Sequence, residues 1–205
     1  AIVLYFRKQK TEKVCRECGF TLIKDVFTKK DLMKIWQDIN IFRDQPVSLT
    51  SRTVTTGIGE TVSLNLPDIE AYMARVSYLW GSRRRGRNSK TGQALILEAK
   101  ENLPYIKIAP KTNFFTGLKF FYKPAKDNME EIKADRDYNL YCQQERAQTA
   151  LDILAGVLPQ IKKDKFVVEI SGKWIVVVKW GYTTNFDKFV NKALPIAKAF
   201  DEKYL

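Results

Sequence analysis

The chain has 205 residues, of which 45% are hydrophobic, 12% aromatic and 28% charged, and it carries a net charge of +12 without any histidine. This composition excludes a disordered chain and is ample for a hydrophobic core. The lack of histidine excludes serine–histidine and cysteine–histidine nucleophilic sites, so any catalysis must use carboxylates, lysine, tyrosine or cysteine. The basic excess indicates nucleic acid or an acidic membrane surface as partner, or merely a surface that keeps the protein soluble.

The chain begins with AIVLYF and then turns abruptly to RKQK. No uninterrupted run of about 18 apolar residues follows, and no signal peptide is visible. The opening residues predict either an ordinary N-terminal strand or the end of an upstream transmembrane helix. In the second case Arg7, Lys8 and Lys10 would be the positive cluster on its cytoplasmic side. Three cysteines are too few for a disulfide framework, which favours a reducing compartment.

Cys15 and Cys18, in the pattern CRECG, have the spacing of one half of a zinc site. A structural zinc ion needs four ligands, and the chain offers only Cys142 besides. Three interpretations remain: a zinc ion shared between two copies of the chain, a redox pair, or a degenerate ribbon that serves only as a turn. Zinc is therefore the one cofactor suggested, and sharing it would require a homo-oligomer.

The next elements are a helix and two strands. Apolar residues recur at helical spacing over 29–41, which predicts a helix. Residues 46–66 alternate with period two and carry Gly57 and Gly59, which predicts a strand pair with a glycine turn.

Residues 72–100 predict a long hairpin with an exposed loop over 81–92. The cations of this loop are Arg83, Arg84, Arg85, Arg87 and Lys90. They could neutralise nucleic-acid phosphates, a salt-sensitive attraction that is independent of base sequence. They could equally lie on anionic lipid headgroups, at about 1 kcal/mol per cation, or stay solvated without a partner. No aromatic residue lies between the arginines, so base stacking is not indicated.

Asp68 is followed some thirty residues later by the Glu98-x-Lys100 pattern on a predicted strand. This arrangement resembles the PD-(D/E)xK nucleases. In those enzymes the two carboxylates hold a divalent cation and the lysine positions or activates water. The competing interpretation is coincidence, because Asp68 precedes an element rather than lying inside a strand, and Glu-x-Lys is frequent in a lysine-rich chain.

Four further elements precede the last part of the chain. Residues 103–110 predict a strand between prolines, and the dense aromatic cluster over 114–122 predicts a core layer, with a docking surface as the alternative. The acidic stretch 127–139 predicts a solvated loop or a helix start. Helical spacing of apolar residues over 138–158 predicts a helix.

The most apolar stretch, 166–180, predicts a β-hairpin closed by the turn residues 171–172. Its second arm is apolar on both faces, as in a central strand that is covered on both sides. Thr184 or Asn185 can cap a last helix, in which Pro195 predicts a kink or a break.

These elements together predict an α+β fold: a mixed or antiparallel sheet built from hairpins and covered by about three helices. We expect an N-terminal segment over 1–30 and a single domain over 31–205, with a sub-boundary near residue 126.

The order of elements is an apolar N-terminal end followed by a basic segment, then a long hairpin with a polar loop, an aromatic strand, a helix, a short hairpin and a last helix. Over residues 70–190 this order resembles a group of uncharacterised membrane-anchored bacterial proteins with a cytoplasmic α+β domain. The resemblance implies a membrane-associated location on the cytoplasmic side. No residue motif in the resemblance is specific enough to identify a functional site in this chain.

Two functional hypotheses follow. The first is a non-enzymatic basic domain at the cytoplasmic face of a membrane, held by an upstream helix or by its basic surface, which acts through contacts with protein or lipid. The second is a soluble cytoplasmic protein that binds nucleic acid through the arginine loop, with or without nuclease chemistry at Asp68, Glu98 and Lys100.

Overall fold

The computed structural model describes the backbone of residues 20–21, 39, 45–47, 52–66, 69–82, 86–111, 129–133, 136–180 and 186–204. Side chains are described for residues 39, 71–73, 92–111, 129–132, 136–180, 188–189 and 191–200. The predicted helix over 29–41 lies outside these residues except for Ile39, which is buried. The aromatic cluster over 114–122 lies outside them entirely.

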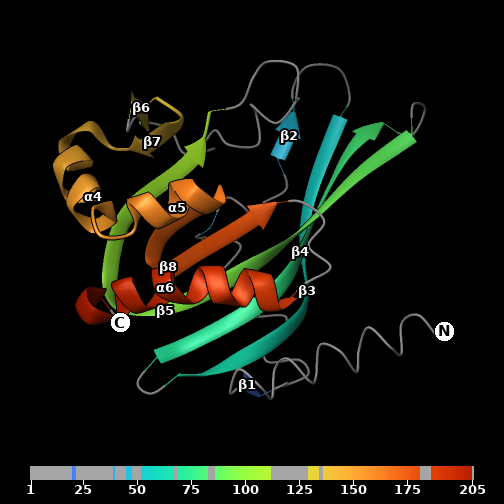
Figure 1. Ribbon diagram of the computed structural model, residues 1–205. Helices are drawn as coiled ribbons and strands as arrows, with labels where there is room; N and C mark the ends of the chain where they lie inside the picture. Colours follow the sequence, from blue (N-terminus) through green and yellow to red (C-terminus); the bar gives the residue numbers. More distant parts are fainter. Residues whose placement is uncertain are drawn as a thin grey trace.

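The described strands form one antiparallel sheet, and three helices accompany it (Figure 1). The strands are β1 (Phe20–Thr21), β2 (Gln45–Val47), β3 (Arg52–Leu66), β4 (Ile69–Ser82), β5 (Gly86–Pro110), β6 (Glu130–Lys133), β7 (Tyr138–Cys142) and β8 (Val167–Trp180). The helices are α4 (Ala147–Leu154), which follows a short 3₁₀ turn over Gln144–Arg146, α5 (Leu158–Asp164) and α6 (Phe186–Tyr204). This arrangement confirms the predicted α+β class.

The strand order is β1-β3-β4-β5-β7-β6, with β2 added to β3 and β8 added to β5. The 25-residue strand β5 joins the two halves of the sheet. On one edge it pairs first with β4, from Gly86 to Leu97, and then with β7, from Lys107 to Pro110. On its other edge it pairs with β8, from Gly92 to Ile108. Strand β5 therefore pairs with three other strands and connects the two halves of the described sheet.

The predicted hairpin over 166–180 is wrong, because this stretch forms the single strand β8. Both halves of β8 pair with the same strand, β5, instead of with each other. Gly172 nevertheless has the left-handed backbone conformation of a turn residue, with φ of 59°, which glycine adopts without steric cost. It produces a bend rather than a reversal.

Strand β5 bends at the same level. Its eight steps from Glu98 to Ile106 stand opposite only four steps of β8, from Trp174 to Ile170. Extra residues of this kind form a bulge, which increases the local twist and coils the sheet. Figure 1 shows the resulting curve of β5, with β8 visible between α5 and α6.

The two irregularities keep one apolar face continuous. Before the bend the core residues of β5 are odd-numbered, as in Leu95 and Leu97, and after it they include the even-numbered Ile106 and Ile108. In β8 the helix-side residues change in the same way, as the buried core residues Val168, Ile170, Ile175 and Val177 show. Since strand side chains alternate with period two, both strands must shift phase together to keep facing the helices.

Strand β8 is buried on both faces, as predicted: Ile175, Val176, Val177 and Val178 are each fully buried. Its predicted central position is not supported by the part of the sheet that is described, where β5 is its one partner. The helices supply the cover on one face. In α6 the buried stripe is Phe189, Ala193, Ile196, Ala197 and Phe200, and the helix continues through Pro195 without the predicted break.

Two other expectations are corrected by strand pairing. The helix predicted over 138–158 begins only at Ala147, because its first five residues form β7, in which Tyr138, Leu140 and Cys142 alternate into the core. The acidic stretch before it supplies β6, which pairs with β7.

The strand pair predicted over 46–66 is one long strand, β3, with the short β2 beside its start. The glycines do not form a turn. Instead the pairing of β3 with β4 is irregular between Ile58 and Thr61, which places a bulge where the turn was expected.

Replacing Gly92 by alanine should destabilise the protein. Gly92 pairs with Trp180, and a Cβ there would lie 2.6 Å from the Lys179 carbonyl oxygen and 3.0 Å from the Trp180 ring. Because the close atom belongs to backbone, β5 and β8 must separate, at a cost of about 1–3 kcal/mol in unfolding free energy. The matched control is Gly156→Ala, where nothing lies within 4 Å and a gain of up to about 1 kcal/mol is expected. Urea denaturation measures both, and equal effects would contradict the packing described.

Candidate anion-binding surface

Several of the predicted site residues lie outside the described part of the chain: Cys15, Cys18, Asp68, Arg83, Arg84 and Arg85. Glu98 and Lys100 lie on β5, as the strand-borne pattern predicted, with Glu98 partly buried and Lys100 exposed. Among the described residues no group of three or more histidines, cysteines, aspartates or glutamates could hold a metal ion.

The predicted loop over 81–92 is shorter than expected. Strand β4 runs to Ser82 and β5 begins at Gly86, with these two residues paired. Arg87 and Lys90 therefore belong to β5. Gly92 is the first residue of β5 that pairs with β8. Before it, residues 86–91 of β5 pair with β4, so β4 and β5 form a two-stranded ribbon there. In Figure 1 the end of this ribbon lies away from the helices.

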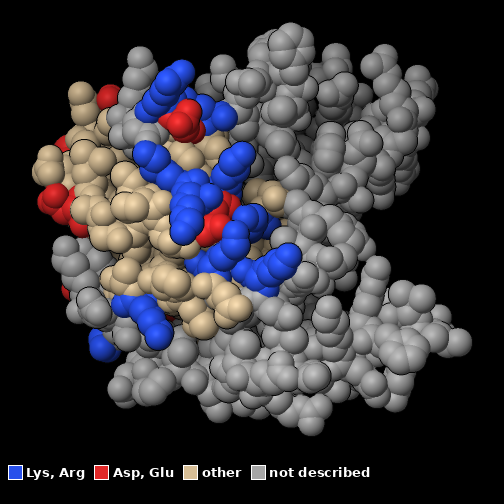
Figure 2. Space-filling model, in the orientation of Figure 1, with Lys and Arg blue, Asp and Glu red and all other residues tan. Residues whose placement is uncertain are grey.

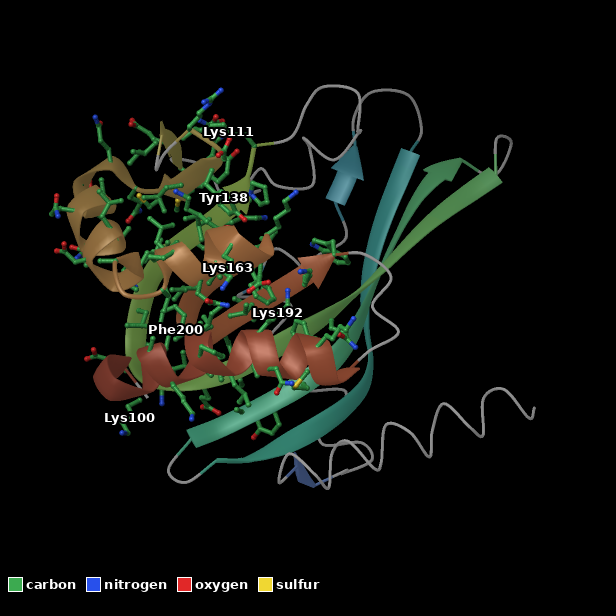
Figure 3. All side chains as sticks on the ribbon, viewed as in Figure 1. Lys100, Lys111, Tyr138, Lys163, Lys192 and Phe200 are labelled. Atoms are coloured by element: carbon green, nitrogen blue, oxygen red, sulfur yellow. The ribbon has the colours of Figure 1, made fainter. Side chains whose placement is uncertain are left out.

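A second basic region lies on the helical side of the sheet and was not predicted. We call it the lysine face, defined as Lys162, Lys163, Lys165, Lys179, Lys188 and Lys192. Its members come from α5 and its end, from the end of β8 and from α6. In Figure 2, lysine and arginine side chains gather over this region around a small acidic area, and in Figure 3 the labelled Lys163 and Lys192 lie close together on it.

A buried carboxylate joins the three elements of the lysine face. Asp164 is only 5% exposed. One of its carboxylate oxygens forms an ion pair with Lys192 of α6, and the other accepts a hydrogen bond of 2.6 Å from Gln160. Its backbone carbonyl accepts a hydrogen bond of 2.8 Å from Lys179 of β8. The negative charge is thus engaged inside the protein, and the outward-facing charge of the lysine face is positive.

Lys179 is held from two sides. Besides its bond to Asp164, its ammonium group lies 5.6 Å from the centre of the Phe166 ring, within cation–π range. Partial burial lowers the pKa of Lys179, and the charges of Lys192 and Lys165 lower this pKa further, against the opposing charge of Asp164. Lys165 and Lys192 are therefore close enough to Lys179 for their charges to act on it.

Lys165 ends α5 in the left-handed conformation, with φ of 57°. Its N–H donates to the carbonyl of Lys162 at 3.2 Å, and the N–H of Phe166 donates to the carbonyl of Ile161 at 3.0 Å. These are the two hydrogen bonds of a Schellman motif, in which glycine is the usual left-handed residue. The chain thus places a cation where the backbone favours glycine.

The opposite face of the sheet carries a row of polar side chains on four neighbouring strands. The polar row consists of Glu131, Tyr141, Lys107 and Glu169, which are successive cross-strand pairs on β6, β7, β5 and β8. Lys107 and Glu169 are completely buried, 3.4 Å apart. Asn139 donates to Glu131 at 2.6 Å and to the Tyr141 hydroxyl at 3.4 Å. Burial raises the pKa of Tyr141, partly offset by the Asn139 hydrogen bond, so the phenol stays neutral.

Both unpredicted features have a signal in the sequence. Lys107 and Glu169 are single charges inside the apolar strands PYIKIAP and FVVEI, and such isolated charges are typical of a buried pair. The lysine face has a weaker signal, because its residues are spread over three elements and only the fold brings them together.

No helix among the described residues is both long and apolar enough to cross a membrane. Comparison with protein-family models, with curated proteins and with solved structures gives no match. The functional assignment therefore depends on the residues and geometry described above.

Replacing Asp164 by alanine should lower the unfolding free energy by about 2–3 kcal/mol, because the ion pair with Lys192 and the hydrogen bond from Gln160 are lost together. The loss is smaller than for a fully buried pair, since Lys192 is 45% exposed and water can solvate its charge. Asp152→Ala is the control: this exposed carboxylate of α4 accepts a hydrogen bond from Gln148 one turn earlier, so a change within about 0.5 kcal/mol is expected. Similar losses for both variants would disprove the role given to Asp164.

A double-mutant cycle should reveal strong coupling between Lys107 and Glu169. Lys107→Met or Glu169→Leu alone leaves one buried charge without its partner and should cost about 3–5 kcal/mol. The double variant should cost clearly less than the sum, with a coupling above about 1 kcal/mol by chemical denaturation. Additive losses would mean that the two charges do not interact in solution.

Proposed function

We propose that the chain is a non-enzymatic binding domain that attaches to the anionic cytoplasmic face of a membrane through its basic surface. The observation that carries this proposal is the lysine face, where six lysines come from three packed elements and two of them, Lys179 and Lys192, contact the internally engaged Asp164. Its partner is the lipid surface itself or an acidic surface on a membrane protein. Each cation close to an anionic leaflet contributes about 1 kcal/mol of attraction.

The chemistry of the lysine face favours lipid over nucleic acid. All six of its cations are lysines, which are flexible, strongly hydrated point charges. Arginine, with its planar fork of donors, is the usual residue for bidentate recognition of nucleic-acid phosphates and bases. A fluid layer of headgroups offers no fixed spacing of charges, so it suits mobile ammonium groups on long side chains.

Vesicle co-sedimentation tests the proposal. The variant Lys162→Gln/Lys163→Gln/Lys188→Gln removes three cations from the lysine face without touching the lysines that contact Asp164. It should lose roughly 100-fold in partitioning onto vesicles that contain phosphatidylserine, since each of the three cations contributes about 1 kcal/mol. Wild-type binding should also weaken as salt is raised, because exposed charges are screened.

The matched control is Lys100→Gln/Lys173→Gln/Lys198→Gln, in which all three lysines are exposed elsewhere on the molecule. Figure 3 shows Lys100 well apart from Lys163 and Lys192. The two triple variants have the same net charge, so only a surface-specific mechanism predicts different binding. Equal losses, or no binding of the wild type to anionic vesicles, would refute the proposal.

One observation favours nucleic-acid binding as the second candidate: the ribbon of β4 and β5 carries Arg87 and Lys90 at its end. Its test is replacement of Arg83, Arg84, Arg85, Arg87 and Lys90 by serine, which should abolish salt-sensitive binding to duplex DNA or RNA. Nuclease chemistry at Asp68, Glu98 and Lys100 would in addition require magnesium or manganese and would be lost on Glu98→Ala. Nucleic-acid binding that survives loss of the five cations would eliminate this candidate.

A further inference from the structure

The conformation of Lys165 needs an explanation beyond the helix end. It is the one residue other than glycine with positive φ in the described part of the chain. The Schellman hydrogen bonds use backbone N–H groups, which glycine would donate equally well. The side chain is exposed and takes no part in those bonds. A strained residue that is unnecessary for local structure indicates a role for its side chain.

That side chain belongs to a group of three ammonium ions. Lys179 and Lys192 both contact Asp164, and Lys165 is the residue after Asp164 in the chain. The charges of both Lys165 and Lys192 act on Lys179. The three lysines come from the end of α5, from β8 and from α6, so the fold rather than local sequence assembles them. Lys179 and Lys192 are already held by Asp164, which reduces the side-chain entropy that a ligand must remove.

The group matches a particular kind of anion. A phosphodiester headgroup carries one negative charge, whereas a phosphomonoester carries close to two and presents three strong acceptor oxygens. Three neighbouring lysines fit the second better than the first. Asp164, which is paired with Lys192, offsets one of the three positive charges. The remaining charge of about +2 still matches a phosphomonoester better than a singly charged phosphodiester.

We propose that Lys165, Lys179 and Lys192 form a site for the phosphomonoester group of a membrane lipid, and that Lys165 keeps its strained conformation in order to supply the third cation. The inference depends on the proposed function, since it names the headgroup chemistry that the lysine face selects. The site adds selectivity to the general attraction of the surrounding lysines.

The decisive variant is Lys165→Gly, which removes the cation and the strain together. It should raise the urea midpoint of unfolding while reducing binding to vesicles that contain phosphatidic acid by more than about tenfold, because the general attraction of one cation and the third headgroup contact are lost together. Binding to phosphatidylserine vesicles of matched surface potential should fall by at most about fivefold, since only the roughly 1 kcal/mol of one cation is lost. Lys165→Asn, whose side chain tolerates the left-handed conformation, should show the same loss of selectivity. Lys100→Gln is the control for removal of one charge.

Each outcome decides between the site and the general surface. If the wild type binds both kinds of vesicle equally at matched surface potential, the phosphomonoester site is wrong while membrane attachment stands. If it binds neither, both proposals fail. If glycerol 3-phosphate competes as well as phosphatidic acid vesicles do, the ligand is a free phosphate rather than a lipid. If an oligonucleotide displaces the vesicles by occupying the same three lysines, the partner is nucleic acid.

Discussion

The pairing of β8 with the bent strand β5 is the constraint on which the other described features depend. The bulge of β5 and the positive φ of Gly172 lie opposite each other, and each shifts the alternation of its strand. Either irregularity alone would turn half of one strand's apolar side chains away from the helices. Together they let the sheet curve while one continuous apolar face remains against α4, α5 and α6.

The lysine face is a consequence of the same geometry. The end of β8 brings Lys179 to the end of α5, where the carbonyl of Asp164 accepts its hydrogen bond, and α6 brings Lys192 to the carboxylate of the same residue. The edge-to-face contact of Phe166 with Phe189, at 5.9 Å between ring centres, fixes α6 beside this point. The Phe166–Phe189 contact and the Lys192–Asp164 ion pair thus both hold α6 against the end of α5.

The sequence was sufficient for the fold class and for the apolar elements, because period-two and helical spacing are local signals. The prediction is wrong where a local signal has a different outcome in the complete sheet. Ser171-Gly172 is a typical hairpin turn sequence, but both flanking segments pair with β5, so the chain only bends there. Residues 138–142 fit the pattern of a helix because a five-residue strand contains too few apolar positions to outweigh the helical spacing that follows it. The arginine loop could be found as a run of like charges, whereas the lysine face could not, since Lys165, Lys179 and Lys192 meet only after three elements have packed.

The long sequence separation between β5 and β8 has a kinetic consequence. Paired residues of the two strands are 60 positions apart at Ile108 and Val168 and 88 apart at Gly92 and Trp180, whereas β4 and β5 form a local hairpin. Local contacts close quickly and distant ones slowly. The arginine-bearing ribbon can therefore form early in folding, while Asp164, Lys179 and Lys192 come together only at the final closure of the sheet. A chain that has not completed this step would already carry its full positive charge but would lack the organised surface that gives the charge its selectivity.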